Sequence, residues 1–184
     1  MRMKNGEEYY RRFLEGDQTA FTRLVEIYFD NLTFFIKRYV RDFTTAEDIA
    51  MDSMLELIIH KKRYDFRCSL KTYLFMLGRS KALNYLKRNK RIVLTENDSN
   101  YFTNLQDSTT PESELLLSER KVLINNALKD LPSDMREAVY LVYFEDQTYE
   151  QVAKIMKKNV KQIDNLLYRA KIVLRTILKK EVVE

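Results

Sequence analysis

Apolar residues recur at helical spacing from the start of the chain, and polar residues with good capping chemistry mark where helices begin. A short helix is expected over residues 7–14, ending near Gly16. Asp17 can then cap a longer helix whose apolar and aromatic positions continue to Tyr39. The dense aromatic spacing of this second helix predicts a buried core and assigns it no chemistry.

The same pattern predicts two further helices in the first half of the chain. Thr44, with Glu47 three residues later, has the spacing of a capping box at the start of a helix that runs to about His60. After a loop, Ser69 can cap a helix that ends near Asn89.

The periodicity then stops and later resumes. Residues 92–111 are rich in Asn, Asp, Ser and Thr and show no period, which predicts a flexible acidic linker. Helical spacing returns over residues 112–131 and again, after Pro132, over residues 133–144. The expected fold is therefore all-α, with two small helical domains (residues 1–91 and 112–184) joined by the linker.

The last stretch indicates a helix-turn-helix. Thr148 and Gln151 form a second capping-box pattern, and Asn159 is the residue expected to adopt the left-handed conformation in the turn. At about 100° per residue, polar amides and cations of the final helix share one side, opposite its apolar stripe. An ordinary solvated face is the alternative, but the short capped helix before it favours base reading, because Arg suits guanine and Asn or Gln suits adenine. The candidate duplex-contacting residues are Lys158, Asn159, Lys161, Gln162, Asn165 and Arg169.

The net charge of +5 hides a strong internal polarity. Residues 61–91 contain eleven Lys or Arg against one acid, and residues 154–180 contain nine against one. Residues 92–119, between them, contain six acids and no base. Two basic blocks separated by an acidic connector predict two polyanion-binding units. In the first block, cations interleaved with aromatic residues are typical of single-stranded nucleic-acid binding, although a core role for Tyr73 is equally compatible with the pattern.

One acidic strip stands out on the helix that begins near Thr44. Like charges three or four residues apart repel each other, so the strip weakens an isolated helix. Lys61, Lys62 and Arg63 could relieve it internally; docking of a basic partner is the favoured interpretation, because apolar residues lie beside the acids. The candidate docking residues are Glu47, Asp48, Asp52 and Glu56.

Several function classes are not supported by the composition. There are three Gly and no glycine-rich phosphate loop, His60 is the only histidine and Cys68 the only cysteine. We therefore expect no catalytic residues, no metal, no cofactor and no disulfide. No apolar run approaches a membrane span and the N-terminus lacks a signal-peptide core, so no membrane insertion and a cytoplasmic location are expected.

Three stretches together resemble the bacterial RNA polymerase sigma factors of the extracytoplasmic-function (ECF, group IV) type. They are AEDIAMDSMLELI, then LKTYLFMLGRSKALNYLKRNKR, then ALKDLPSDMREAVYLVYFEDQTYEQVAKIM with its following YRAK. The resemblance covers roughly residues 16–91 and 118–180. It implies a sigma region 2-like domain and a region 4-like domain with the helix-turn-helix.

The resemblance also implies what each domain binds. Region 2 docks on the clamp helices of core RNA polymerase and opens the minus-ten promoter element, while region 4 reads the minus-35 element as duplex DNA and sits on the flap. Asp48 and Asp52 match the clamp-binding helix, and the predicted duplex readers fall in the minus-35 helix. The residues implied in minus-ten binding are Phe66, Ser69, Lys71, Tyr73, Arg79, Asn84, Lys87 and Arg88.

Some positions depart from the family pattern. Ser80 stands where Asn is frequent, Tyr73 replaces a frequent Trp, and Asp164 and Leu166 stand where Lys and Arg are frequent. On the helical projection, Asp164 and Leu166 flank the predicted reading face. The departures put the promoter sequence in question more than they do docking on polymerase.

The leading hypothesis is thus a sigma factor whose partners are core RNA polymerase and promoter DNA, associated with the nucleoid when bound to polymerase. Many members of the family are held inactive by an anti-sigma factor, although no residue here indicates one. The first alternative is a stand-alone helix-turn-helix regulator that binds duplex operators, which would leave the acidic strip and the first basic block unexplained. An enzyme acting on nucleic acid is a third class, disfavoured by the near absence of His.

Overall fold

The computed structural model describes residues 5–90, 127–128 and 130–181. These residues form two compact units, the first containing α1 to α4 and the second containing α6, most of α7, and α8. Every element in this part of the chain is a helix, as the sequence predicts. The predicted linker over 92–111, and the start of the helix predicted over 112–131, lie outside the described residues, so the domain boundaries stay a prediction.

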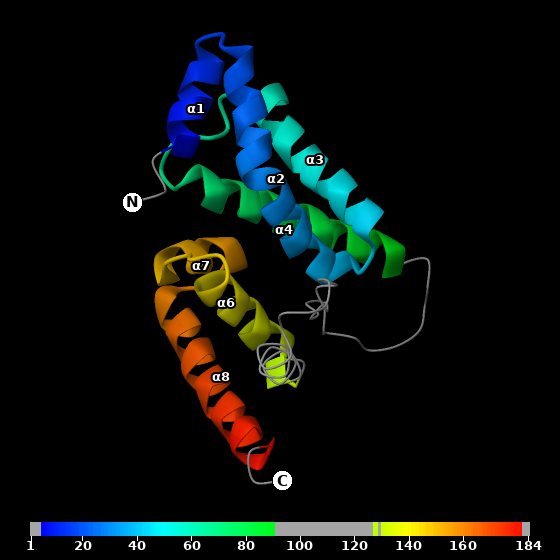
Figure 1. The fold of residues 1–184 in the computed structure, drawn as a ribbon, viewed down its shortest axis with the longest axis vertical. Coiled ribbons are helices and arrows are strands. Elements are labelled where there is room, and N and C mark those ends of the chain that lie inside the picture. Colours follow the sequence, from blue (N-terminus) through cyan, green and yellow to red (C-terminus); the bar gives the residue numbers. More distant parts are fainter. Residues whose placement is uncertain (1–4, 91–126, 129, 182–184) are drawn as a thin grey trace, which may run out of the picture. The chain divides into compact units, whose positions relative to one another are not determined.

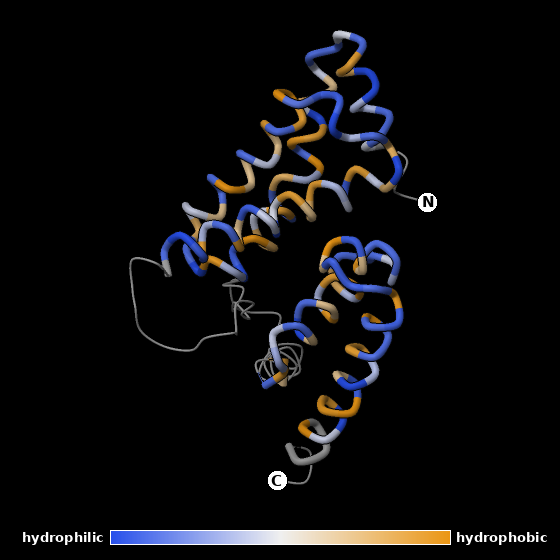
Figure 2. The backbone as a smooth tube through the Cα atoms, turned by 180° about the vertical axis from the view of Figure 1, so that it is seen from behind, coloured by the Kyte–Doolittle hydropathy of each residue, from blue (hydrophilic) through white to orange (hydrophobic). Residues whose placement is uncertain are grey.

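The first unit is a bundle of four helices (Figure 1). Helix α2 (Gln18–Val40) packs against all three others, namely α1 (Asn5–Leu14), α3 (Phe43–Ile59) and α4 (Leu70–Lys90). Helices α2 and α3 run side by side, and α4 crosses them. Apolar and polar residues alternate around each helix in Figure 2, which is the pattern of amphipathic helices that share one core.

Close packing of α2 on α4 depends on Gly78. A Cβ atom at this position would lie 2.9 Å from Leu32 Cδ1 and 3.0 Å from Ile36 Cδ1, which is closer than normal carbon contacts allow. The fully buried core of the first unit is mainly aromatic and aliphatic, as the spacing predicts: Tyr10, Leu24, Leu32, Phe35, Ile36, Met54, Leu57, Leu70, Leu74 and Phe75.

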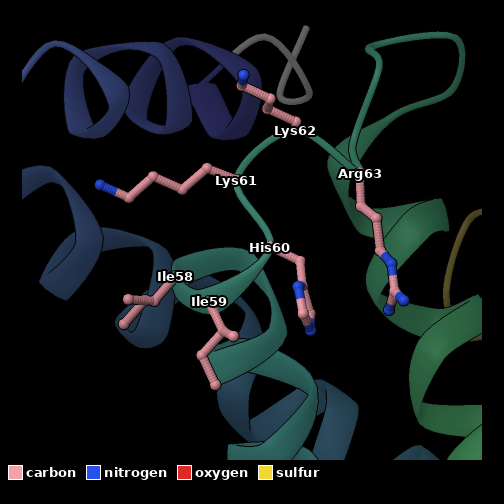
Figure 3. Close-up of a pocket in the computed structure, with 6 residues that line it drawn as sticks. All are labelled: Ile58, Ile59, His60, Lys61, Lys62 and Arg63. Atoms are coloured by element: carbon pink, nitrogen blue, oxygen red, sulfur yellow. The ribbon is translucent and has the colours of Figure 1, made fainter.

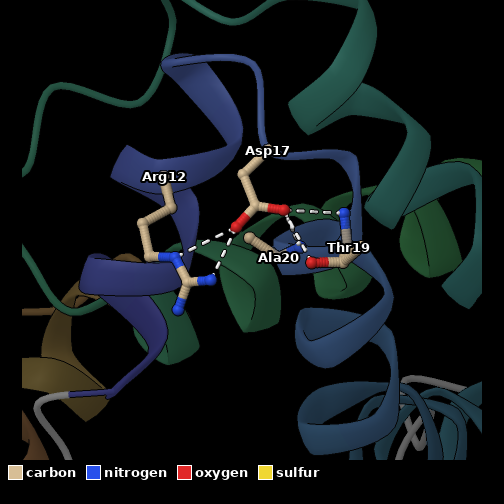
Figure 4. Close-up of polar contacts among 4 residues, drawn as sticks. All are labelled: Arg12, Asp17, Thr19 and Ala20. Carbon is tan, nitrogen blue, oxygen red and sulfur yellow. Dashed lines mark hydrogen bonds and ion pairs between the residues drawn. The ribbon is translucent and has the colours of Figure 1, made fainter.

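The predicted cap at Asp17 is confirmed (Figure 4). Asp17 Oδ1 accepts hydrogen bonds from the Thr19 N–H (3.0 Å), the Thr19 hydroxyl (2.6 Å) and the Ala20 N–H (3.3 Å). The other oxygen accepts from the Arg12 guanidinium of α1 at 2.6 Å. The Thr19 bonds, followed by those of Arg12, lower the pKa of Asp17 to about 2. One carboxylate therefore both starts α2 and fixes its junction with α1.

The capping box predicted at Thr44 and Glu47 is wrong. Helix α3 begins two residues earlier than the box would place it, and its cap is Asp42, whose carboxylate accepts from the Thr45 N–H at 2.7 Å. Asp is at least as good a cap as Thr, and the left-handed residue Arg41 (φ 64°) ends α2 just before it. The tight turn between the two helices thus moves the cap to Asp42.

The second unit contains α6 (Ser133–Tyr143), α7 (Tyr149–Met156) and α8 (Val160–Glu181). Helix α6 packs against α8. The buried Arg136 guanidinium donates to the carbonyl oxygens of Leu128 (2.9 Å) and Leu131 (2.6 Å), which fixes the residues before α6 to that helix. The core of this unit comprises Leu131, Met135, Ala138, Leu141, Val152, Ile155, Ile163, Leu167 and Ala170.

Candidate nucleic-acid interface and docking face

The turn between α7 and α8 is built from contacts between residues close in sequence. The predicted capping box of α7 is confirmed: the Thr148 N–H donates to Gln151 Oε1 (2.7 Å) and the Gln151 N–H to Thr148 Oγ1 (3.4 Å). At the other end, the Lys158 N–H donates to the Ala153 carbonyl at 2.9 Å, the bond of a Schellman motif.

The residue that takes the left-handed conformation in this turn is Lys157 (φ 55°), so the prediction that it is Asn159 is wrong. Asn159 instead caps α8. Its N–H donates to Gln162 Oε1 (2.9 Å), and the Gln162 N–H donates back to Asn159 Oδ1 (2.8 Å). A second capping box therefore follows the first, with an amide at each end.

This arrangement changes what two predicted DNA-contacting residues can offer. The side-chain oxygens of Asn159 and Gln162 are occupied within the turn, which leaves their NH₂ groups to act as donors. Lys161, Asn165 and Arg169 are exposed on α8, opposite its buried stripe. Lys158 is only 27% exposed, and its ammonium lies 2.9 Å from the Asp134 carboxylate of α6.

Two exposed apolar residues on α8 were not among the candidates. Tyr168 and Ile172 are 66% and 49% exposed, and by helical spacing they continue the outward face of Lys161 and Asn165. Their i, i+4 spacing on the polar side was the available signal.

An aromatic cluster lies at the loop between α3 and α4. Tyr64 and Phe66 belong to the loop, Tyr10 to α1 and Tyr73 to α4. The Tyr64 ring centroid lies 4.7 Å from that of Phe66 and 5.1 Å from that of Tyr73. Tyr10 and Tyr64 are buried, whereas Phe66 and Tyr73 are half-buried at its surface. Phe66 is left-handed (φ 62°), an unusual conformation for an aromatic residue, and the Arg11 guanidinium lies 5.0 Å from its ring centroid. The cluster thus combines two buried rings, Tyr10 and Tyr64, with two accessible rings, Phe66 and Tyr73.

Long-range hydrogen bonds hold this loop in place. The Tyr10 hydroxyl donates to the carbonyls of Leu57 (3.0 Å) and Lys61 (3.2 Å), and burial raises its pKa to about 12. The Leu70 N–H, at the start of α4, donates to Glu7 Oε1 of α1 at 2.7 Å. Neither Tyr10 nor Glu7 was a sequence candidate, because their partners lie about fifty residues or more away along the chain.

Ser69 acts as the N-cap of α4, as predicted: its hydroxyl accepts from the Thr72 N–H at 3.1 Å. Lys71, another minus-ten candidate, is half-buried with its ammonium 5.5 Å from the Phe75 ring. Ser69 and Lys71 therefore stabilise the start of α4, and they form little of its outer surface.

The remaining minus-ten candidates on α4 do not all lie together. Asn84, Lys87 and Arg88 are exposed and share one side of the helix, and Tyr73 lies on the same side nearer the loop. Arg79 is half-buried and points well away from this side by helical spacing. The structure therefore forms a stripe from the loop along the outer face of α4, without Arg79.

The acidic strip on α3 separates into two parts. Asp48 and Asp52 are exposed and, within the described part of the chain, have no ion-pair partner. Glu47 is half-buried to one side. Glu56 is only 15% exposed and pairs with Arg63 of the loop and with Lys81 of α4 at 3.8 Å, and His60 Nε2 lies 3.9 Å from the same carboxylate.

Apolar side chains accompany the exposed acids. Met51 and Leu55 are 41% and 38% exposed, and Ile59 reaches 68%. Two other apolar residues of the same helix, Ile49 and Met54, are buried in the core. By helical spacing the exposed residues form one surface, which we call the docking face: Asp48, Met51, Asp52, Leu55 and Ile59.

A shallow hollow lies where α3 ends, lined by residues 58–63 (Figure 3). Its cationic side chains do not converge: Lys61 and Arg63 point to opposite sides of the loop. No group of three or more His, Cys, Asp or Glu in the described residues could hold a metal ion. Over the same residues, no helix is long and apolar enough to cross a membrane.

Two family models match the chain, one over its first half and one over its second. Residues 24–92 match the family model for sigma-70 region 2, and residues 121–174 match the model for sigma-70, region 4. The ECF RNA polymerase sigma-E factor of Haemophilus influenzae is 29% identical over 167 residues, covering 87% of this chain and 88% of that protein. The ECF RNA polymerase sigma factor SigM of Bacillus subtilis is 24% identical, covering 86% and 95%.

Solved structures share the fold. The sigma factor RpoE, in complex with the anti-sigma factor NepR from Bartonella quintana, superposes with a TM-score of 0.63 at 21% identity, covering 86% of this chain and 96% of that one. CnrH, in complex with the cytosolic domain of CnrY, gives 0.66 at 15% identity, covering 96% and 99%. With regions 2 and 4 matched in order, the chain belongs to the sigma-70 family of RNA polymerase sigma factors, in its ECF group, and acts in promoter-directed initiation of transcription.

Proposed function

We propose that the docking face on α3 binds the clamp helices of core RNA polymerase. The observation that carries this proposal is the exposure of Asp48 and Asp52, unpaired within the described residues, among three exposed apolar side chains. Like charges one turn apart destabilise a helix, and exposed apolar surface adds no stability in water. A basic partner with an apolar centre would offset both costs. Glu47, at the edge of this face, would contribute at its rim.

We propose that the loop and the outer side of α4 bind the melted minus-ten strand. The half-buried rings of Phe66 and Tyr73 offer surfaces on which an unstacked base can stack, and Asn84, Lys87 and Arg88 continue from the loop as a polar and cationic track. Ser69 and Lys71 would support the loop from the start of α4. Arg79, on another side of the helix, would act through packing or a separate phosphate contact.

We propose that α8 reads the minus-35 element from the major groove. Lys161, Asn165 and Arg169 supply exposed donors and acceptors, and the NH₂ groups of Asn159 and Gln162 supply donors beside them. Lys158 would contact phosphate in competition with Asp134. The polymerase flap is the proposed second partner of this unit.

The proposed setting is the cytoplasm, with association to the nucleoid while bound to polymerase, and the protein would carry out no covalent chemistry. The RpoE and CnrH structures contain an anti-sigma factor and a cytosolic domain as partners. We propose by analogy that an anti-sigma factor regulates this chain as well.

The test combines core polymerase binding with run-off transcription from genomic fragments. Asp52→Lys should weaken core binding at least about tenfold, since it reverses a charge in the centre of the docking face. Asp30→Lys is the matched control, because Asp30 is an exposed acid on α2 of the same unit. Duplex DNA binding by the full chain, which α8 is proposed to carry out, should change to the same small extent in both variants.

Two results would contradict the proposal. Equal loss of binding in Asp52→Lys and Asp30→Lys would indicate a general charge effect and not a docking face. Failure of the unmodified chain to bind core, together with tight binding to a palindromic duplex, would support a stand-alone helix-turn-helix regulator.

A further inference from the structure

Glu56 belongs to the acidic strip in sequence but not in its environment. Its side chain is 15% exposed, whereas Asp52 and Asp48, one and two turns earlier, lie open on the docking face. Three basic side chains surround it. Arg63 forms an ion pair with Oε1, His60 Nε2 lies 3.9 Å from the same oxygen, and Lys81 Nζ lies 3.8 Å from Oε2.

These contacts join three different parts of the first unit. Glu56 lies near the end of α3, Arg63 lies in the loop, and Lys81 lies on α4. The carboxylate therefore holds the middle of the loop to the helix that follows it. A partly buried charge with two cationic partners resists displacement more than an exposed pair, because fewer water molecules compete for it.

The contacts also orient the basic residues of the loop. Figure 3 shows Arg63 and Lys61 turned to opposite sides. Arg63 pairs with Glu56, and the Lys61 ammonium lies 4.9 Å from the Phe13 ring. The Tyr10 hydroxyl fixes the carbonyl of Lys61 from the α1 side. Without Glu56, the loop would keep its α1 anchor but lose the charged link that joins Arg63 to α3 and, through Lys81, to α4.

The accessible rings of the aromatic cluster depend on this loop geometry. Tyr64 follows Arg63 directly and contacts both Phe66 and Tyr73. Burial raises the pKa of Tyr73, and the negative charge of Glu56 adds to this effect, which is consistent with their proximity. A shift of Arg63 would therefore move Tyr64 and, through it, the two rings offered to a base.

We infer that Glu56 is a positioning residue that holds the loop between α3 and α4 in the conformation that receives the melted strand, and is not a contact to polymerase. The inference rests on the proposed role of this loop. Glu56 would then set the geometry of the loop, and this acid of the strip would not belong to the docking face.

The first part of the test uses trypsin on the full chain, because Lys61, Lys62, Arg63 and Arg67 are cleavage sites inside the loop. Glu56→Gln should speed cleavage at these sites about fivefold, since the charged anchor is lost while side-chain size is kept. Lys81→Met breaks the same anchor from α4 and should have a smaller effect in the same direction. Glu26→Gln is the matched control, because it removes the exposed Arg23–Glu26 pair of α2 (2.6 Å), far along the chain from the loop.

The second part measures binding of the polymerase-bound protein to single-stranded minus-ten DNA from a promoter found by run-off transcription. An abasic site is placed at each position in turn. The unmodified protein should prefer the intact base at one position about tenfold, as loss of a stacked base predicts. Glu56→Gln should reduce that preference to about twofold, while its affinity for core polymerase stays within twofold of the unmodified value.

If trypsin cleaved Glu56→Gln faster but the variant kept its full preference for the intact base, the inference would be overturned. The loop would then open without changing how the melted strand binds. Unchanged cleavage, or a loss of core affinity matching that of Asp52→Lys, would overturn it as well. If the unmodified protein showed no base preference at any position, the proposed role of the loop would fail and the inference with it. Cleavage rates would in that case still report separately whether Glu56 anchors the loop.

Discussion

The loop between α3 and α4 and the turn between α7 and α8 are both proposed to present residues to DNA, but they are held in different ways. The turn is fixed by residues three to five positions apart, through two capping boxes and a Schellman bond. The loop has local bonds as well, such as that from the Tyr64 hydroxyl to the Cys68 carbonyl, but residues far apart in sequence join it to the rest of the bundle. Glu7 bonds to Leu70, Tyr10 bonds to Lys61, and Glu56 pairs with Lys81.

This difference has a physical consequence. Local contacts form whenever their helices form, so the turn should keep its geometry as long as α7 and α8 are helical. Long-range contacts require the whole bundle, so the loop should open whenever α1 separates from the rest. We therefore expect the melted-strand site to be sensitive to the stability of its unit, and the duplex-reading site to be robust.

The largest expected effect comes from removing the buried anchor of the loop. Tyr10→Ala should destabilise the first unit by about 3–5 kcal/mol, because a fully buried aromatic ring and a buried hydroxyl with two acceptors are lost together. Hydrogen exchange should show lost protection in α1 to α4 with unchanged protection in α6 to α8. Tyr168→Ala, at a 66% exposed position, should change stability by less than about 0.5 kcal/mol. Loss of protection in both units would contradict the expectation that the turn keeps its geometry when the first unit is destabilised.

A smaller effect is expected at the start of α4. Glu7→Gln replaces a charged acceptor of the Leu70 N–H with a neutral one and should cost about 1–2 kcal/mol in the free energy of unfolding of the first unit. Denaturant titration of the full chain, followed by probes in each unit, would measure it. Glu8→Gln, at an exposed neighbouring position, is the control and should be close to neutral. Equal effects of the two would mean that the helix charge matters and the long-range bond does not.

The contrast between loop and turn also explains how much was predictable from the sequence. Asp17, Ser69 and Thr148 were predicted as caps and are confirmed, since a cap is read from residues within three positions. The wrong prediction for Asn159 also has a local cause. Asn suits both the left-handed turn and the N-cap, and the second use prevails because Gln162 stands three residues later.

The candidate sites show the same difference between contacts within one helix and contacts between helices. Helical spacing placed Asp48 and Asp52 on one surface and Lys161, Asn165 and Arg169 on another, because spacing within one helix determines relative direction. It could not separate Glu56 from the acids before it, since the partner Lys81 belongs to another helix. Tyr10 and Glu7 carried no local signal for their roles, which arise only when α1 meets the loop.

Within the turn itself, Asn159 provides the next test. Asn159→Ala should cost the second unit about 1 kcal/mol, because the capping box at the start of α8 is lost. Asn159→Ser keeps a capping oxygen and should be within about 0.5 kcal/mol of the unmodified chain. Thermal unfolding of the C-terminal half gives the stability, and duplex binding gives the function. If both variants lost the same DNA affinity while differing in stability, the NH₂ group would be a direct contact. Equal stability of the two would show that the box contributes little.

The smallest expected effect on stability concerns Asp134 and Lys158. Their pair is partly exposed, at 50% and 27%, so Asp134→Asn should change stability by no more than about 1 kcal/mol. Its effect on DNA binding should be larger in relative terms, because Lys158 would become available to a phosphate. The slope of log affinity against log salt should then steepen by about one unit, with higher affinity at low salt. Asp130→Asn removes the same charge from an exposed site of the same unit before α6 and controls for the general field. An equal gain in both variants would assign the effect to net charge. A gain confined to Asp134→Asn would show that a contact between two helices limits the affinity of a turn whose shape is set locally.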